Sequence, residues 1–260
     1  MSSRGRVLLS VLALAGALVA GQTAFALTMH PSYFGTNVSF TGIQETSTFG
    51  DPEPLFGAPT GLADQLLFFP ANFTATTAGA GGFDATGAQL QLVMTATSPG
   101  ATLDTLLIDE FGDNTLIGAG GAGTSTFATM AGFVTITHTT AGAISPVVIG
   151  FNAGGGVNGS FTPAALGATG LAMPAYAGVT LWSGSVAIDI ASIVPNATRA
   201  VLSFDNDLYA FSEAGSSAKI QKKVVDGPAI VISIVPEPGT LALLCGGLLA
   251  LTIRARGRRA

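Results

Sequence analysis

Two groups of acidic and amide side chains are the residues of this 260-residue chain whose types could bind a cation. They comprise Asp109, Glu110, Asp113 and Asn114 in the first group and Asp205, Asn206 and Asp207 in the second. Calcium binds carboxylate and amide oxygens of this kind, although neither group has the spacing of an EF-hand loop. Turn formation explains both groups as well, because Asp and Asn favour turns. We therefore expect the first group at the end of a strand and the second in a turn.

No firm metal site and no cofactor other than calcium is expected from these residues. The weak calcium candidates are Asp109, Glu110, Asp113, Asp205 and Asp207. Two carboxylates from the same set could also support glycoside hydrolysis, but their separation in space does not follow from the sequence. Trp182 and the three tyrosines are too few to define a sugar-stacking platform.

Other catalytic patterns are weak or missing. A serine or cysteine nucleophile needs an adjacent base, and the only histidines are His30 and His138, far apart in the chain. The segment Gly118–Gly123 matches G-x-G-x-x-G, yet a second strand pattern follows it, where a dinucleotide site needs a helix and an acid about 20 residues later. We expect a flexible turn there and no enzyme.

The elements that must position these residues are short strands. Apolar and polar residues alternate through much of the chain, with Val186, Ile188 and Ile190 on one face and Asp189 on the other. This period of two predicts half-buried strands. The expected strands are 33–40, 65–69, 88–95, 103–109, 132–138, 147–151, 179–182, 185–190, 199–204, 208–211, 218–224 and 229–234. One short helical turn is expected within 163–170, and Gly/Ala-rich loops at 77–87, 118–126 and 152–160.

Many short strands joined by glycine-rich turns predict an all-β fold, an antiparallel β-sandwich of jelly-roll type formed by residues 27–234. This region has four basic residues against fourteen acids, a net charge of −10. Such a charge disfavours binding to nucleic acid or to anionic membranes. No disulfide within this region can stabilise it, because the only cysteine of the chain is Cys245, which lies outside it.

Residues 1–26 have the order of a secretory signal peptide, with a helix over their apolar part. Arg4 and Arg6 precede the apolar segment Val7–Ala20, and Ala24 and Ala26 form a small-x-small cleavage site. The protein is therefore expected to cross the inner membrane and to meet signal peptidase.

The C-terminal residues 235–260 combine three unlike features. Pro236, Glu237 and Pro238 precede the apolar segment Leu241–Ile253. A basic tail follows, with arginines at Arg254, Arg256, Arg258 and Arg259. This order resembles the PEP-CTERM sorting signal, found in exported proteins of bacteria that make exopolysaccharide. The resemblance implies recognition of Pro-Glu-Pro by an exosortase, removal of the segment beyond it, and a final location in the envelope or outside the cell.

The apolar segment is short for a permanent anchor. It has 13 residues, where a helix that spans a bilayer needs about 20. The arginines behind it favour a cytoplasmic tail. The segment is thus expected to form a short transmembrane helix that holds the protein transiently, and an ordinary single-span anchor without processing stays the alternative.

Residues 203–223 show a second, looser resemblance to the penultimate hairpin of many PEP-CTERM proteins, with an Asp-Asn turn and a Lys-Lys strand. The sequence thus predicts an exported, non-catalytic protein of the envelope or exopolysaccharide matrix with a structural or adhesive role. The alternative is a carbohydrate- or calcium-binding, lectin-like module.

Overall fold

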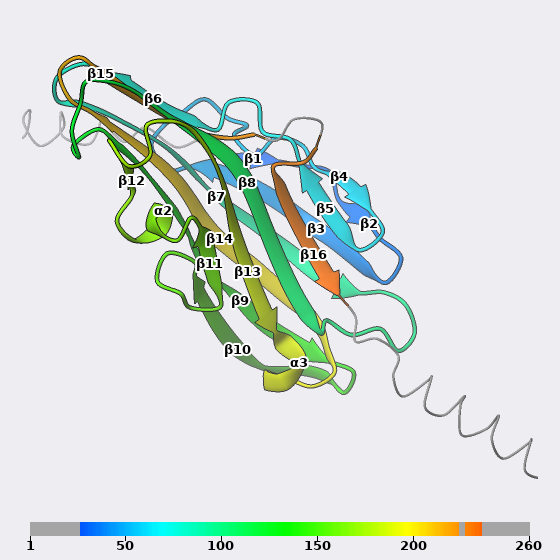
Figure 1. Cartoon of the computed structure of the whole chain (residues 1–260). Coiled ribbons are helices and arrows are strands. Elements are labelled where there is room, and N and C mark those ends of the chain that lie inside the picture. Colours follow the sequence, from blue (N-terminus) through cyan, green and yellow to red (C-terminus); the bar gives the residue numbers. More distant parts are fainter. Residues whose placement is uncertain (1–26, 224–226, 236–260) are drawn as a thin grey trace, which may run out of the picture.

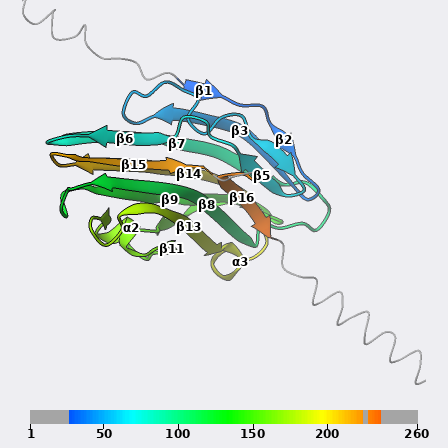
Figure 2. The ribbon, with the colours of Figure 1, turned by 45° about the horizontal axis from the view of Figure 1, so that its top comes forward.

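The computed structural model describes residues 27–223 and 227–235, which form two antiparallel sheets. The first sheet contains β1 (Leu27–Met29), β2 (Tyr33–Phe34), β3 (Val38–Ser47), β7 (Gly82–Ala96), β9 (Ser125–Thr139), β10 (Gly142–Asn152), β12 (Leu171–Ala172) and β14 (Ala197–Ser212). The second contains β4 (Thr60–Leu62), β5 (Gln65–Phe68), β6 (Thr74–Ala78), β8 (Thr105–Gly118), β11 (Gly159–Thr162), β13 (Gly178–Asp189), β15 (Ser216–Lys222) and β16 (Ile230–Val235). The two sheets lie face to face (Figures 1 and 2). The predicted all-β antiparallel sandwich is confirmed.

The main path of the first sheet runs β1-β3-β7-β14-β9-β10, and that of the second runs β11-β13-β8-β16-β5-β4. Strand β8 is long enough to pair with β13 along one edge and with both β15 and β16 along the other. Two short helices, α2 (Ala165–Ala168) and α3 (Ile190–Ile193), connect strands. The helical turn expected within 163–170 is therefore present as α2.

The core is a layer of apolar side chains between the sheets. Phe56, on the loop after β3, contacts three other rings edge-on. The centroid distances are 5.9 Å to Phe68, 5.4 Å to Phe73 and 5.9 Å to Phe204. Because Phe204 belongs to the first sheet and Phe68 to the second, this aromatic cluster ties the two layers together. Burial of such side chains is the main stabilising term.

The connection between β14 and β15 differs from the predicted hairpin. A tight turn follows β14, in which the Ser216 amide donates to the Glu213 carbonyl at 3.1 Å. The chain then enters the second sheet, where β15 pairs with β6 and β8. Strands β14 and β15 thus lie on opposite layers, so their inward side chains face each other across the core.

Several expected boundaries were wrong. The strands expected at 199–204 and 208–211 are the single strand β14, and the expected loop at 77–87 is mostly strand, because β7 begins at Gly82. The glycines there do not end the strand, since only Gly79 and Gly81 adopt a positive φ at the turn itself.

The predictions for the two chain ends fall outside the described residues. These are the signal helix and its Ala24/Ala26 cleavage site, the Pro236-Glu237-Pro238 motif, the apolar segment and the arginine tail. Among residues 27–223 and 227–235, no helix has the length and apolar character needed to cross a membrane.

Candidate functional site

The acids proposed as calcium ligands lie on three different surfaces. Asp205 and Asp207 lie on the outer face of the first sheet, Asp109 and Asp113 lie on the outer face of the second, and Glu110 points into the core. The expected strand end and turn were wrong, because both groups lie within the long strands β8 and β14. In the described part of the chain, no three His, Cys, Asp or Glu residues form a group that could hold a metal ion. Calcium binding stays a prediction from residue type.

The outer face of the first sheet has a series of hydrogen-bonded polar side chains, which we name the polar ladder. Its members are Gln44, Gln89, Gln91, Thr129, Asp205 and Asp207. The Gln44 Nε2 amide donates to Gln91 Oε1 at 2.8 Å, and strand register places Gln89 beside Asp205, to which it donates at 3.2 Å. Neighbouring strands thus present aligned amide and carboxylate groups to solvent.

Aromatic rings continue this face toward the β6–β7 turn, and we name them the aromatic strip. They are Phe49, Phe83, Phe127, Tyr209 and Phe211. The Tyr209 ring lies 5.8 Å from Phe49 and 6.1 Å from Phe127, measured between centroids. Phe83 and Phe211 are directly paired across β7 and β14 with their centroids 5.2 Å apart. Phe83 is 60% exposed, so much of this apolar surface is open to solvent.

Asp207 joins the polar ladder to the aromatic strip. Its Oδ2 accepts hydrogen bonds from Thr129 Oγ1 at 3.1 Å and from the Tyr209 hydroxyl at 3.3 Å. Burial raises the pKa of Asp207 despite these two bonds, and burial together with the nearby carboxylate raises the pKa of Tyr209 to about 12. Tyr209 therefore keeps its proton at neutral pH.

Gly87 makes room for this arrangement. A methyl group at Gly87 would lie 2.1 Å from Asp207 Oδ1 and 2.9 Å from the Phe49 ring. Because Gly87 has no side chain, the Asp207 carboxylate and the Phe49 ring can pack directly against β7.

The outer face of the second sheet is different. Its exposed apolar residues include Val179 and Leu181 on β13 and Phe111 and Ile117 on β8. Leu181 is 77% exposed and is paired in register with Asp113, which accepts hydrogen bonds from Gln221. Among the described residues, this face has no ring–ring contacts like those of the aromatic strip.

Glu110, Asn206 and Lys222 meet between the sheets, and we name them the buried lysine cluster. The Lys222 Nζ donates to Glu110 Oε2 at 2.5 Å and to Asn206 Oδ1 at 2.6 Å. The Asn206 amide nitrogen donates to Glu110 Oε1. Lys222 is only 2% exposed, and the other two residues are fully buried. A lysine and a carboxylate are rarely buried this deeply unless they are paired.

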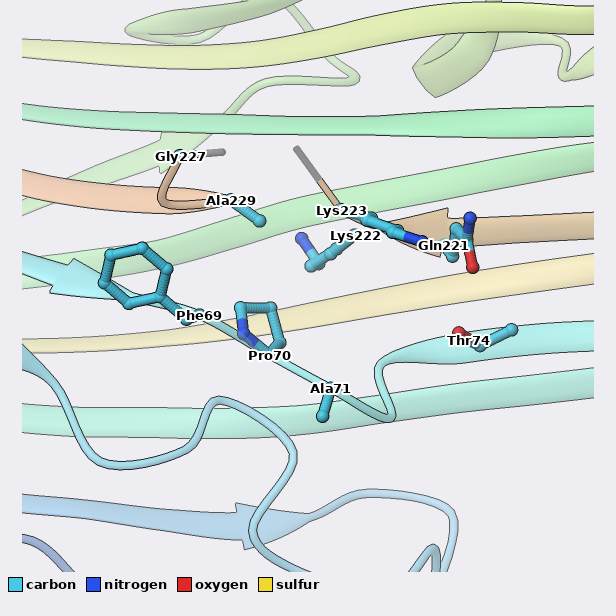
Figure 3. A pocket seen from close by; sticks show the side chains of 9 residues that line it. All are labelled: Phe69, Pro70, Ala71, Thr74, Gln221, Lys222, Lys223, Gly227 and Ala229. Carbon is cyan, nitrogen blue, oxygen red and sulfur yellow. The ribbon is translucent and has the colours of Figure 1, made fainter. Parts of the chain in front are cut away.

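The surroundings of this cluster are aromatic. The Lys222 Nζ lies 5.1 Å from the Phe73 ring centroid and 5.5 Å from that of Trp182. Gly112 leaves space for the indole, because a methyl group there would lie 2.4 Å from it. Lys222 also lines a surface hollow of about 360 Å³, together with Lys223 and Gln221 (Figure 3).

Burial moves both titrating groups of this cluster toward their neutral forms. It raises the pKa of Glu110 and lowers the pKa of Lys222, and the mutual attraction of the two charges offsets only part of each effect.

The remaining candidates from the sequence are separate from these sites. His30 Nε2 lies 3.7 Å from Glu45 Oε1, whereas His138 Nδ1 contacts Thr137 Oγ1. The Gly118–Gly123 segment connects β8 to β9, two strands, as expected for a turn. Trp182 is buried, so the rings on the open face are those of Tyr209 and of four phenylalanines that were not among the aromatic residues expected to bind sugar. One signal in the sequence could have identified these rings, namely that they occupy alternate positions of a strand. The positions are Phe127 and Thr129 on β9, and Asp207, Tyr209 and Phe211 on β14.

Comparison with solved structures gives distant matches. The enzymatically active domain of bacteriophage CBA120 tailspike protein 4 is 13% identical with a TM-score of 0.22; the match covers 82% of this chain but only 20% of the tailspike chain. A xylan-binding module, CBM15, is 13% identical with a TM-score of 0.21, covering 83% of this chain and all of the module. TmCBM61, solved with β-1,4-galactotriose, is 7% identical with a TM-score of 0.20, covering 82% and 90% of the two chains.

No curated protein sequence matches this chain. The family comparison concerns the C-terminal end, where the model of the PEP-CTERM protein-sorting motif matches residues 235–259. The resemblance of Pro236-Glu237-Pro238, the apolar segment and the arginine tail is thereby confirmed. This motif implies export, processing by an exosortase and association with the cell envelope. This chain therefore has a PEP-CTERM protein-sorting motif at residues 235–259.

Proposed function

We propose that this protein is a non-catalytic polysaccharide-binding module of the cell envelope, with the outer face of the first sheet as its binding surface. The observation that supports this most is the adjacency of the polar ladder and the aromatic strip on one open face. Aromatic rings pack against the apolar faces of sugar rings, and amide and carboxylate groups hydrogen-bond to hydroxyls. A lectin-like role thus accounts for this face better than a purely structural one.

The negative charge of the domain limits the kinds of polysaccharide that it could bind. Asp205 and Asp207 lie on the binding face, and residues 27–235 have a net charge of −10. An anionic polysaccharide would be repelled by this surface. We therefore assign a neutral polysaccharide of the exopolysaccharide matrix as the ligand, and the sorting motif would bring the module to it after signal peptidase and exosortase act.

The test is affinity electrophoresis of the full chain in detergent, through gels that contain xylan, a neutral β-glucan or anionic alginate. The Phe211→Ala variant should lose the retardation caused by a neutral polysaccharide. Phe111→Ala is the matched control, because both phenylalanines are 38% exposed and lie on opposite outer faces. Equal retardation of both variants, or retardation by alginate alone, would contradict the proposal.

Two further measurements separate the alternatives. Reducing-end assays on the same polysaccharides should show no depolymerisation, and release of sugars would instead identify a hydrolase. Calorimetry with Ca²⁺ alone, and gels run with a chelator, test whether the acids bind calcium independently of the polysaccharide.

A further inference from the structure

The buried lysine cluster has a composition and geometry that go beyond an ion pair. A primary amine, a primary amide and a carboxyl group are in mutual hydrogen-bond contact, and none of the three is open to solvent. An amine beside an amide can displace ammonia from it and form a new amide. The binding face uses none of these three side chains, so their chemistry is independent of the proposed function.

We propose that Lys222 and Asn206 form an intramolecular amide bond between their side chains, with Glu110 as the catalytic residue that moves the protons. The bond joins β15 to β14 and so links the second sheet covalently to the first. The product is a permanent cross-link in a region of the chain that contains no cysteine.

The geometry places the reacting atoms close together. Lys222 Nζ is 2.6 Å from Asn206 Oδ1, and Cγ is bonded to that oxygen at about 1.2 Å, so the nitrogen and the carbon are at most about 3.8 Å apart. Fixed positions close to this separation favour reaction, because the entropy of bringing the groups together has already been lost in folding. Phe73 and Trp182 exclude water from the lysine and so disfavour hydrolysis.

The protons can be followed through each step. The Lys222 ammonium gives a proton to the Glu110 carboxylate, which leaves a neutral amine; the directions of both pKa shifts favour this exchange. The amine nitrogen attacks Asn206 Cγ, the N–C bond forms, and the carbonyl electron pair moves to Oδ1. Glu110 contacts both nitrogens, so it can protonate Nδ2 and accept the second amine proton. The carbonyl re-forms as the Cγ–Nδ2 bond breaks.

Atoms and charges balance without another reactant. A lysine ammonium and an asparagine amide become one secondary amide and one ammonium ion, with Glu110 again ionised. No oxidation or reduction occurs, and the backbone is unchanged.

Mass spectrometry of trypsin-digested full chain tests the proposal directly. In unlinked protein, trypsin should release the peptide Ala200–Lys219, which contains Asn206, and should also cleave after Lys222. Linked protein should instead give Ala200–Lys219 joined to Ile220–Lys223, with a mass lower than the sum of the two peptides by one ammonia. Separate peptides and free cleavage after Lys222 in the folded wild-type protein would overturn the proposal.

Variants then test the role of each residue. Glu110→Gln should leave the peptides unlinked while Trp182 fluorescence reports whether the core is intact, and a linked Glu110→Gln protein would contradict the catalytic role of Glu110. Lys223→Ala and Asn114→Ala are the matched controls: Lys223 is the exposed neighbour of Lys222, and Asn114 is a buried asparagine that donates to Thr126 instead. Both should keep the linked peptide. This measurement needs no polysaccharide, so its failure and that of the proposed function are distinguishable.

Discussion

Asp205, Asn206 and Asp207 are adjacent on β14 but face two different environments. The two aspartates lie on the outer face, where exposed Asp205 accepts from Gln89 and partly buried Asp207 accepts from Thr129 and Tyr209. Asn206 points into the core and contacts Lys222 and Glu110. Side chains of similar chemistry thus have different roles on the two faces of one strand, because successive residues of a strand alternate between faces.

The two environments also differ in the free energy that is needed to keep a side chain charged. On the outer face, Asp205 is exposed to water, whereas Asp207 is partly buried and accepts two hydrogen bonds that offset only part of the effect of burial on its pKa. In the core, each group of the buried lysine cluster depends on the others, since an isolated buried charge is strongly unfavourable. Substitutions on the inner face should therefore affect stability, and substitutions on the outer face should affect binding.

The largest expected effect follows removal of the buried amine. Lys222→Ala leaves Glu110 without its partner and also prevents the proposed link to Asn206, so we expect the free energy of unfolding to fall by at least about 3 kcal/mol. Urea unfolding followed by the fluorescence of Trp182, the only tryptophan, measures this. Lys223→Ala should change the same quantity by less than about 0.5 kcal/mol. Equal losses in the two variants would remove the contrast between buried and exposed lysine.

On the outer face, Tyr209→Ala should weaken binding of a neutral polysaccharide about tenfold, or about 1.4 kcal/mol. The ring contacts Phe49 and Phe127, and its hydroxyl contacts Asp207. Tyr209→Phe keeps the ring and should lose less affinity than Tyr209→Ala. Affinity electrophoresis over a range of polysaccharide concentrations gives both values, and an unaffected Tyr209→Ala variant would place binding elsewhere.

A methyl group at Gly87 should disturb the same face without touching the buried lysine cluster. In Gly87→Ala the new carbon would displace the Asp207 carboxylate and the Phe49 ring. We expect binding to weaken about fivefold, close to 1 kcal/mol. The Asn206–Lys222 linked peptide should be unchanged. Loss of that peptide in Gly87→Ala would show that the two faces are coupled.

The smallest expected effect is a pH dependence. Because the pKa of Asp207 is raised above its ordinary value of 3.8 in the folded protein, the folded state binds more protons than the unfolded state between these two values. The contribution to stability is therefore present at low pH and lost as the pH rises through the raised pKa. Asp207→Asn should be more stable than wild type at about pH 7, and the difference should vanish at about pH 3. Urea unfolding at both pH values checks this sign.

Much of the fold could be predicted because its signal is local. Alternation such as Val186, Ile188 and Ile190 identified strands, and the glycine-rich turns between them indicated a two-sheet sandwich. Residues 205–207 lie within β14 and do not form the predicted turn, although Asp and Asn favour turns. The apolar alternation of Leu202, Phe204, Leu208 and Ala210 passes through Asn206 without interruption, and so marks Asn206 as an inward polar residue.

The sequence alone was enough to predict the strand character of residues 27–235 and to identify the sorting motif that follows them, because hydrophobic period and motif order are properties of neighbouring residues. Only the tertiary structure decided which side chains meet. The aromatic strip brings Phe49, Phe83 and Phe211 together from distant parts of the chain. The buried lysine cluster exists because the chain changes sheets after β14, which places Asn206 opposite Lys222 and beside Glu110. Such contacts depend on strand order and register, and these are set by packing of the whole core.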